Sequence, residues 1–469
     1  MKSGLNYKLS ELAQLKIHFI GIGGAGMSGI ARIMLAKGFS ISGSDKSDSS
    51  TLTALKALGA KIYVGHAAEN LADTQLVIVS SAITENNPEF AEAKSRGIPI
   101  AARAVALAWL MSESTSVAVA GTHGKTTTTA MLTVALQSAG LDPSFAIGGT
   151  INTAGINAHS GSGSIFVAEA DESDGSFLAY KPTGAIITNV ELDHVDHFAD
   201  EEAVYAVFED FISSIKDDGF LVACGDDPGV KTLLSRITRS DLKIYLYGKG
   251  SSNDFRIDQI NLAPNSSRAI ISITGRKVGE LNLTVVGEHN LLNALAAFAA
   301  ATAMGGSEEK LLAGLKAFTG TRRRFELKGE VGGIKVIDDY GHHPTEVLVT
   351  LKAARNLAGA GRVIVIFQPH RYSRTAAFTN QFSNSLALAD FTYLLEVYAA
   401  SEKPIPGVSS LLIARGMKAE QVKFEPSMLQ VVSDVVDMAK SGDLILTLGA
   451  GDVSSLGDPI LQALASRFA

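Results

Sequence analysis

The chain has 469 residues, of which 46% are apolar and 19% are charged, with 45 glycines and 12 prolines. A chain of this length is too long to fold around one ordinary hydrophobic core. At about 150 residues per domain, we expect three domains. Acidic residues outnumber basic ones, 48 against 41, and the resulting net charge of -7 argues against a nucleic-acid-binding protein.

Cysteine usage and hydropathy indicate the compartment. The single cysteine, Cys224, excludes a disulfide within the chain, which suits a reducing compartment and predicts a cytoplasmic location. The charged N-terminus lacks the apolar core and cleavage site of a signal peptide. The most apolar stretch, residues 291–306, is too short and too rich in alanine to span a bilayer, so it predicts a buried helix and no membrane association.

The first segment alternates predicted strands with predicted helices. The strands are KIHFIGI (16–22), FSISGSD (39–45) and LVIVSSAI (76–83). Apolar spacing predicts helices over 27–38 and 51–59, each ending in a glycine, as C-capped helices do. This alternation predicts a parallel sheet, and the polar stretch 109–116 marks the first domain boundary.

The second segment restarts with an apolar run, a glycine turn and a helix over 116–132. Further strands are predicted in 164–173 and 185–190, and short alternating runs from Asp254 to Gly287 predict antiparallel strands. A hinge is predicted at 320–325, and strands follow in 334–340, 362–370, 391–398 and 443–452. The sequence therefore predicts three α/β domains in series, over residues 1–111, 112–319 and 320–469.

The first glycine loop fits G-x-G-x-x-G at Gly21, Gly23 and Gly26. Such a motif alone is about as often a packing turn as a ligand site. Here a strand precedes it, a helix follows, and Asp45 closes the next strand, near the offset of about 20 residues expected for a ribose-binding acid. A helix N-terminus favours any diphosphate, so this loop leaves open whether the ligand is NAD or another nucleotide.

The second loop, AGTHGKTTTT, places Lys125 and Thr126 where a phosphate loop needs a lysine for phosphates and a hydroxyl for Mg²⁺. It departs from the usual pattern at Val119, where glycine is expected. The metal also needs an acid at the end of a neighbouring strand. Of the candidates Glu169, Asp171, Glu172 and Asp174, Glu169 lies nearest a strand end, and we expect at least two of the others to be solvated.

The stretch ELDHVDHF (191–198) offers further metal ligands just after a predicted strand: Asp193, His194, Asp196 and His197. A zinc site is one interpretation. The nearby acids and the phosphate loop instead favour a hard cation that bridges phosphates.

Seven blocks, in order along the chain, resemble the Mur ligase family: HFIGIGGAGMSGIA, AGTHGKTTTT, EADESDGSF, TNVELDHVDHF, GEHNLLNALAA, DDYGHHPTEV and FQPHRYSRT. The resemblance implies an ATP-dependent, amide-forming enzyme of peptidoglycan precursor synthesis. It implies a Rossmann-like UDP-sugar domain, a P-loop ATPase-like central domain and a Rossmann-like C-terminal domain for the amino acid. The two loops then serve two nucleotides, a UDP-sugar and ATP.

Within the family, the resemblance is strongest to enzymes that join L-alanine to the carboxylate of UDP-N-acetylmuramate through an acyl phosphate, releasing ADP and phosphate. The alternative is the recycling branch, which adds the tripeptide L-Ala-γ-D-Glu-diaminopimelate to the same UDP-sugar. The implied partners are small molecules, UDP-N-acetylmuramate, L-alanine and ATP, for a monomer or homodimer. An NAD-binding regulator with an NTPase switch would explain the two loops but not the blocks DDYGHHPTEV and FQPHRYSR.

The resemblance also implies the site residues. The UDP-sugar site comprises Gly21, Gly23, Gly24, Ala25, Gly26, Asp45, Ser80 and Ser81. The ATP site comprises Gly121, Thr122, His123, Gly124, Lys125, Thr126, Thr127, His289, Asn290, Asn293, Arg323 and Asp339. The amino acid contacts Tyr340, His342, Arg371 and Arg374, and the cation, Mg²⁺ or alternatively Mn²⁺, binds Thr126, Glu169 and His194. The implied catalytic residues are Lys125, His194, His342, Arg371 and Arg374.

Two roles stay open at this stage. The block GTRRRF has Arg322 where the family pattern has glycine, so any of Arg322 to Arg324 could match the ATP-contacting arginine, and the resemblance favours Arg323. The alanine amine must arrive uncharged, and His342 is a candidate base by residue type alone.

Overall fold

The computed structural model describes residues 7–152, 154–173 and 175–468. The described chain falls into two compact units. The first contains Met1–Val190, Tyr205–Phe255 and Ala296–Gly314, and the second contains Glu191–Val204, Arg256–Leu295 and Leu315–Ala469. Each unit is described by itself.

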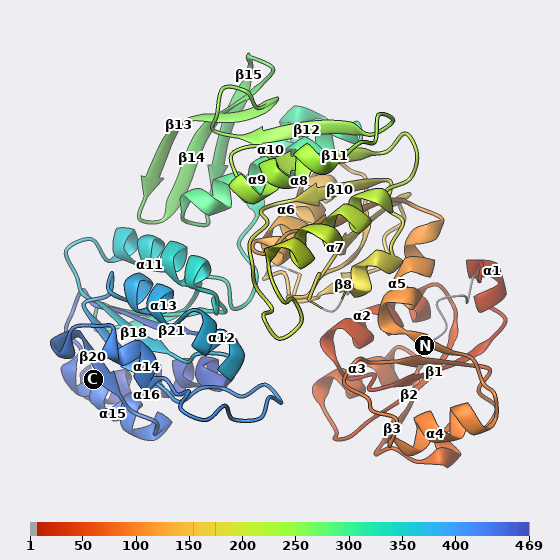
Figure 1. Cartoon of the computed structure of the whole chain (residues 1–469), viewed down its shortest axis with the longest axis horizontal. Helices are drawn as coiled ribbons and strands as arrows, with labels where there is room; N and C mark the ends of the chain where they lie inside the picture. Colours follow the sequence, from red (N-terminus) through yellow and green to blue (C-terminus); the bar gives the residue numbers. More distant parts are fainter. Residues whose placement is uncertain (1–6, 153, 174, 469) are drawn as a thin grey trace. The chain divides into compact units, whose positions relative to one another are not determined.

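The first unit begins with a five-stranded parallel sheet in the order β3-β2-β1-β4-β5, shown in red and orange in Figure 1. Its strands are β1 (Lys16–Ile20), β2 (Ser40–Asp45), β3 (Lys61–Val64), β4 (Leu76–Val79) and β5 (Ile100–Ala102). Its helices are α1 (Leu9–Leu12), α2 (Ala25–Ala36), α3 (Ser50–Ala57), η1 (Ala68–Leu71), α4 (Pro88–Ser95) and α5 (Arg103–Ser112).

The predicted helix ends are confirmed. Helices α2 and α3 are each followed by a glycine with positive φ, Gly38 at 82° and Gly59 at 102°, a conformation that side chains other than glycine resist. The central strands are almost fully buried, because helices cover both faces of a parallel sheet. The carboxyl ends of β1, β2 and β4 meet at one edge, where such sheets bind ligands.

A buried carboxylate, Glu89, connects strands β1 and β2 with the short helix η1. It is fully buried on α4 and accepts hydrogen bonds from Ser44 and from Asn70 Nδ2, the latter at 2.6 Å. His18 Nε2 lies 3.7 Å from its carboxylate. Burial alone would raise the pKa of Glu89, but His18, Ser44 and Asn70 lower it to about 2.

We expect Glu89 to control acid stability. A carboxyl pKa lowered by folding contributes stability above about pH 4.5, and that contribution, about 3 kcal/mol, is lost as pH falls towards 2. The Glu89→Gln variant should therefore lack this part of the acid dependence. Urea unfolding at pH 6 and pH 3, followed by the fluorescence of the single tryptophan, Trp109, measures it. Glu85→Gln, at an exposed site, is the control, and equal pH slopes in wild type and Glu89→Gln would contradict the prediction.

The first unit continues with seven strands in the order β12-β11-β10-β6-β9-β7-β8. All neighbours in this order are parallel except β7 and β8. The strands are β6 (Thr115–Ala120), β7 (Ser144–Ala146), β8 (Ala158–His159), β9 (Ile165–Glu169), β10 (Gly184–Ile187), β11 (Phe220–Cys224) and β12 (Lys243–Gly248). The helices are α6 (Lys125–Ser138), η2 (Ser176–Ala179), α7 (Glu201–Ser213) and α8 (Pro228–Arg236).

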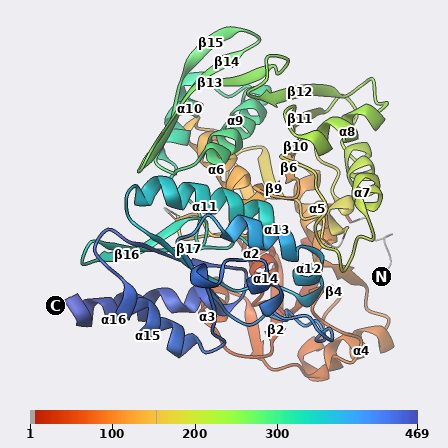
Figure 2. The same cartoon turned by 60° about the vertical axis from the view of Figure 1, so that its left-hand side comes forward.

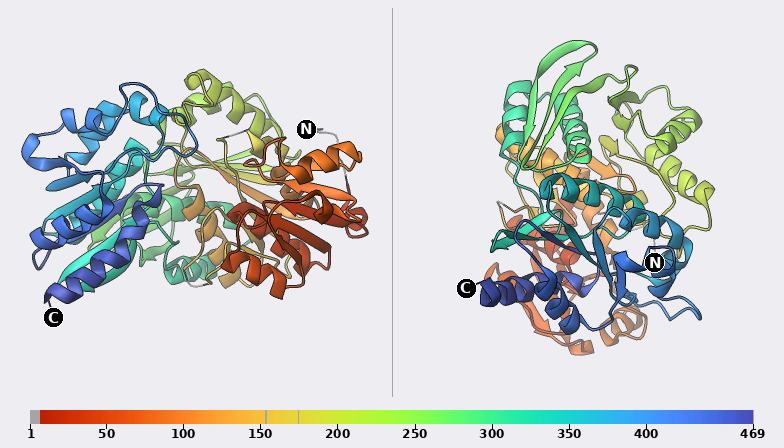
Figure 3. Two further views of the ribbon diagram at one scale, coloured as in Figure 1. Left: turned by 90° about the horizontal axis from the view of Figure 1, so that it is seen from below. Right: turned by 90° about the vertical axis from the view of Figure 1, so that its left-hand side faces the viewer.

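The antiparallel strands predicted between Asp254 and Gly287 are confirmed for β14 (Ser266–Ile273) and β15 (Arg276–Leu283), which pair antiparallel, and β13 (Phe255–Ala263) lies next to β14; these strands are drawn in green in Figure 3. Helices α9 (Glu288–Ala303) and α10 (Glu308–Ala317) follow. The apolar stretch 291–306 lies mainly in α9, where Leu291 and Ala294 to Ala301 are fully buried, as predicted. Within the described ranges, no helix is long and apolar enough to cross a membrane.

The C-terminal sheet lies wholly in the second unit, in the order β16-β17-β21-β18-β19-β20, with only β16 antiparallel to its neighbour. Its strands are β16 (Glu326–Val331), β17 (Ile334–Asp339), β18 (Val363–Phe367), β19 (Phe391–Leu394), β20 (Val422–Phe424) and β21 (Leu444–Leu448). Its helices are α11 (Pro344–Ala358), α12 (Tyr372–Ala377), α13 (Thr379–Leu386), α14 (Leu411–Arg415), η3 (Ala419–Gln421), α15 (Met428–Met438), η4 (Asp452–Leu456) and α16 (Gly457–Phe468).

Two cores sandwich this sheet. Helices α11, α13 and α14 pack on one face, and α15 and α16 pack on the other, as Figure 2 shows. The chain thus has three α/β domains, each built on its own sheet, as the sequence predicts. The precise boundaries at 111 and 319 stay predictions.

Candidate functional site

The glycine loop follows β1 and is shaped by β2 and β4. Gly21 has a φ of 81°, and a Cβ there would lie 3.3 Å from the Cβ of Ser80. The amide of Gly23 donates to Asp45 Oδ2 at 2.8 Å, and a Cβ on Gly23 would lie equally close to that oxygen. Asp45 therefore holds the loop in shape. The predicted UDP-sugar residues at 21–26, 45, 80 and 81 gather at this carboxyl edge, where Gly24 caps α2.

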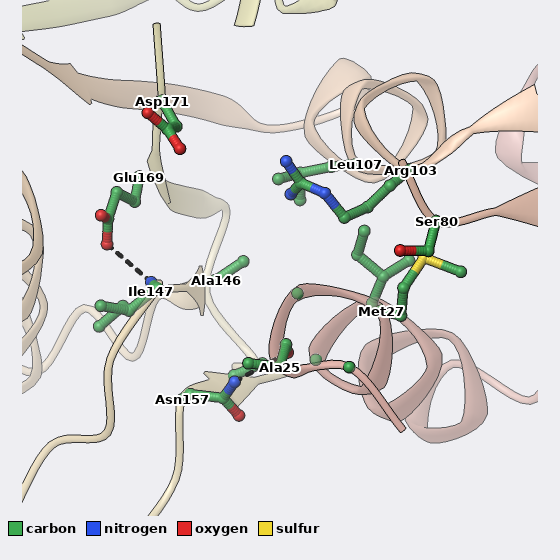
Figure 4. Close-up of a pocket in the computed structure, with 16 residues that line it drawn as sticks. Ala25, Met27, Ser80, Arg103, Leu107, Ala146, Ile147, Asn157, Glu169 and Asp171 are labelled. Carbon is green, nitrogen blue, oxygen red and sulfur yellow. Dashed lines mark hydrogen bonds between the residues drawn. The ribbon is translucent and has the colours of Figure 1, made fainter. Parts of the chain in front are cut away.

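A cavity of about 280 Å³ opens beside the glycine loop (Figure 4). Gly26 and Ser80 line it from the loop side, and Asn157 and Glu169 line it from the side of the second sheet. Arg103, from the start of α5, extends its guanidinium into this space. A cation beside a helix N-terminus suits an anionic ligand such as a diphosphate or a carboxylate.

The second loop has the backbone of a phosphate loop. Gly121 has a φ of 124°, and a Cβ there would lie 2.1 Å from Thr188 Oγ1. The amide of Thr122 donates to Asn189 O at 3.0 Å, and the amide of His123 donates to Asn189 Oδ1 at 2.8 Å. The residues that follow β10 therefore fix the conformation of this loop. Helix α6 begins at Lys125, and Gly124 is its N-cap residue.

Lys125 Nζ is held by four oxygens. It lies 2.8 Å from Gly121 O, 3.1 Å from Thr122 O, and 3.0 and 2.9 Å from the two carboxylate oxygens of Glu172. Burial alone would lower the pKa of Lys125, but the carboxylates of Glu172 and Asp171 raise it, so the ammonium stays charged. The loop thus presents a fixed cation with a carboxylate as its counterion.

Thr126 and Glu169 meet next to this lysine. Thr126 Oγ1 donates to Glu169 Oε1 at 2.8 Å, and the amide of Gly148 donates to Glu169 Oε2 at 2.7 Å, the dashed line in Figure 4. A hydroxyl and a carboxylate side by side are oxygen ligands that suit Mg²⁺. Asp171 is exposed, as expected for a solvated acid, whereas Asp174 lies outside the described residues.

The predicted ATP-binding residues of the second unit lie in two regions, the first turns of α9 and the end of β17. In α9, Asn290 Nδ2 donates to Val286 O at 2.8 Å, and Asn293 Nδ2 lies 3.5 Å from Asn290 Oδ1. His289 stands beside them near the N-terminus of the helix. At the end of β17, buried Asp339 accepts the amides of Phe325 and Gly341 at 2.7 and 2.8 Å.

The arginines of the block GTRRRF have different partners. Arg323 donates to Gly449 O at 2.8 Å, and its Nε lies 3.4 Å from Asp338 Oδ2. Arg324 Nη1 lies 3.6 Å from Glu346 Oε1. Both guanidinium groups lie over the ring of Tyr340, at 4.8 and 5.1 Å from its centroid. These contacts anchor the segment in the C-terminal sheet.

The two predicted carboxylate-binding arginines differ in burial. Arg374 is 2% exposed and its Nε donates to the buried Asp193 at 2.8 Å, which strongly lowers the pKa of Asp193 against the effect of burial. Arg371 has a φ of 72°, precedes α12, and pairs with Asp196 while keeping part of its side chain exposed. The two residues therefore do not share one helix face, because α12 begins after Arg371.

His342 lies beside these arginines. Its Nδ1 is 3.1 Å from Tyr340 O, so Nδ1 donates and Nε2 keeps its lone pair. Its ring packs edge-on to that of His370, with centroids 5.6 Å apart. Burial and the charge of Arg374 lower the pKa of His342 to about 4, despite the opposing charge of Glu346. His342 is therefore neutral at pH 7 and only a weak base.

Two functional-site residues lie outside the sequence-based assignment. Glu172, which was grouped with the acids expected to be solvated, is buried and forms an ion pair with Lys125. Asp193 is likewise buried and forms an ion pair with Arg374. The sequence signal was the cluster of acids after each strand. It could not rank them, because burial depends on partners brought together by folding.

Family comparisons cover most of the chain. Residues 16–115 match the Mur ligase family catalytic domain, residues 119–301 match the Mur ligase middle domain, and residues 323–451 match the Mur ligase glutamate ligase domain.

Individual proteins match over almost their full length. A UDP-N-acetylmuramate–L-alanine ligase of Renibacterium salmoninarum is 49% identical over 462 residues, covering 98% of both chains. One of Saccharopolyspora erythraea is also 49% identical, over 95% of this chain and 92% of its own. The crystal structure of the Thermotoga maritima UDP-N-acetylmuramate–alanine ligase superposes with a TM-score of 0.81 at 28% identity, covering 97% of this chain and all of its own. A murein peptide ligase of Psychrobacter arcticus superposes with a TM-score of 0.70 at 26% identity, covering 96% and 99%.

Proposed function

This chain belongs to the Mur ligase family, and we propose that it joins L-alanine to UDP-N-acetylmuramate at the expense of ATP. The observation that carries the proposal is the 49% identity to L-alanine ligases across 98% of the chain. Among the solved structures, the murein peptide ligase superposes less well than the UDP-N-acetylmuramate–alanine ligase, with TM-scores of 0.70 and 0.81. The enzyme is an ATP-dependent acid–amino-acid ligase of peptidoglycan precursor synthesis.

The chemistry requires activation, because a carboxylate is a poor electrophile towards an amine. The γ-phosphoryl group of ATP moves to the muramoyl carboxylate and yields an acyl phosphate. The amine of L-alanine attacks its carbonyl carbon, and phosphate leaves as the amide forms. Lys125 is the fixed cation for this transfer: its ammonium exchanges the carboxylate of Glu172 for phosphate oxygens when ATP binds.

The same logic assigns the other residues. The diphosphate of the UDP-sugar binds the glycine loop. Arg103, which lines the cavity beside this loop, faces an anionic group of the same ligand, either the diphosphate or the carboxylate. Arg371 and Arg374 hold the carboxylate of L-alanine in the second unit, because a guanidinium matches a carboxylate in shape and charge. His342 Nε2 accepts a hydrogen bond from the amine. His289, Asn290, Asn293 and Asp339 contact the nucleoside of ATP.

Thr126 and Glu169 would hold Mg²⁺, with His194 as a further ligand, and the cation would neutralise charge on the phosphates. We expect Glu169→Gln to raise the Mg²⁺ concentration for half-maximal phosphate release about 10- to 100-fold, because one charged ligand is lost. A chelator should abolish activity in both forms. Glu209→Gln, at an ion pair with Arg236 on the same unit, is the control. An unchanged Mg²⁺ dependence in Glu169→Gln would show that Glu169 does not bind the cation.

The remaining assignments complete the proposal. The domains span residues 1–111, 112–319 and 320–469, the protein works in the cytoplasm where its nucleotide substrates are made, and it is a monomer or homodimer. Sedimentation velocity distinguishes the two oligomeric states.

The experiment that tests the function is phosphate release from ATP and Mg²⁺ with UDP-N-acetylmuramate, comparing L-alanine with the tripeptide L-Ala-γ-D-Glu-diaminopimelate. Release that depends on L-alanine supports the proposal. Release with the tripeptide alone would assign the chain to the recycling branch. No release with either acceptor would refute both assignments.

A further inference from the structure

Arg371 departs from two local preferences at the start of α12. Helix starts favour serine, threonine, aspartate or asparagine, whose side chains accept the free amides of the first turn, but Arg371 at this N-cap position makes no such contact. Its φ is 72° and its ψ is 139°, in the left-handed region that side chains other than glycine resist. Such a conformation persists only where tertiary contacts hold it, and it is typical of functional sites.

The segment after β19, residues 398–402, supplies these contacts. The amide of Tyr398 donates to Pro369 O at 2.8 Å, and Tyr398 O accepts the amide of Arg371, also at 2.8 Å. The Tyr398 ring stacks on that of His370, with centroids 5.6 Å apart and ring planes 13° apart. The backbone that leads into α12 is therefore held by Tyr398 on both sides of His370.

Glu402 supplies the missing helix cap. Its Oε2 accepts the amide of Ser373 at 3.1 Å, and its Oε1 accepts the Ser373 hydroxyl at 2.6 Å. Ser373 is the second residue of α12, so a carboxylate from a distant segment takes the place of an N-cap side chain. The backbone of Arg371 is thus held on one side by Tyr398 and on the other by Glu402, through Ser373.

We infer that Glu402 is a positioning residue for the amino-acid substrate: through Ser373 it holds Arg371 in its left-handed conformation and so sets where this guanidinium meets the carboxylate of L-alanine. The side chain of Arg371 is 29% exposed, so its direction depends on its backbone and on the ion pair with Asp196. Arg374, at 2% exposed, is instead held by burial. The inference rests on the proposed function, since it takes Arg371 as a ligand of the amino acid.

Steady-state phosphate release at varied L-alanine concentration tests the role of Glu402. We expect Glu402→Ala to raise the KM for L-alanine about tenfold, as for the loss of one hydrogen-bonded contact, and to leave kcat and the KM values for ATP and UDP-N-acetylmuramate unchanged. Glu402→Gln should keep the wild-type KM, because its carbonyl accepts the Ser373 amide and its NH₂ donates to the Ser373 hydroxyl. Glu420→Ala, at an exposed carboxylate on η3, is the control.

Two further variants test the route of the effect. Ser373→Ala removes one of the two contacts and should raise the same KM by a smaller factor, which keeps the inference testable if Glu402→Ala does not fold. When Arg371 is already alanine, Glu402→Ala should add nothing to the KM for L-alanine. Fully additive losses would mean that Glu402 does not act through Arg371, and they would overturn the inference.

Other outcomes also overturn the inference. An unchanged KM for L-alanine in Glu402→Ala would show that Glu402 has no positioning role. Equal rises in the KM values of all three substrates would mean that Glu402 only stabilises the domain. Equal losses in Glu402→Ala and Glu402→Gln would mean that its charge matters rather than its contacts with Ser373. Absence of L-alanine-dependent release in the wild-type protein would refute the proposed function, whereas normal wild-type release with any of these results refutes this inference alone.

Discussion

Replacing Lys125 by methionine should reduce ATP-dependent phosphate release at least about 100-fold, the effect of removing one group that stabilises charge in the transition state. The apolar stem of methionine fills the same space, but no cation remains for the phosphates. Phosphate release with saturating UDP-N-acetylmuramate and L-alanine measures the effect. Lys243→Met, at an exposed lysine on β12, is the matched control.

The Lys125→Met variant should also be less stable, because Glu172 is then left buried without its counterion, a cost of about 3 to 5 kcal/mol. The double variant Lys125→Met with Glu172→Gln should recover most of that stability in urea unfolding, yet stay inactive. This separates the two roles of the lysine. Recovery of activity along with stability would mean that Lys125 only neutralises Glu172.

Replacing Gly121 by alanine should abolish ATP binding and lower the free energy of unfolding by about 3 kcal/mol. A φ of 124° is a conformation that alanine resists, and its Cβ would lie 2.1 Å from Thr188 Oγ1 and 2.9 Å from the amide of Thr188. The loop must then move away from the strand that holds it. Isothermal titration with ATP and urea unfolding measure both effects.

Gly140 provides a control at the other end of the same helix. Its φ is 79°, and a Cβ there would meet no described atom within 4 Å. Gly140→Ala should therefore cost about 1 kcal/mol through the backbone alone and leave ATP binding intact. Equal losses of ATP binding in the two variants would show that the close approach to Thr188 is unimportant.

Sequence patterns alone were enough for the architecture and for the backbone of both loops. Alternating strands and helices predicted three α/β domains, and the antiparallel strands before Gly287 appeared where short alternating runs predicted them. Glycine positions were equally informative, because a positive φ or a close backbone approach leaves glycine as the residue that fits. Thr126 and Glu169, predicted to share a cation, lie in hydrogen-bond contact.

Tertiary structure alone decided which charged side chains pair. Glu172 and Asp171 are neighbours in one acidic run, yet the first is buried on Lys125 and the second is exposed. Arg371 and Arg374 are three residues apart, but Arg374 is buried against Asp193, whereas Arg371 stays partly exposed beside Asp196. His66, Ser44 and Glu89 come from three separate segments and meet in one hydrogen-bond network. Local periodicity determines helices and strands, whereas burial and ion pairing depend on contacts between segments far apart in the chain.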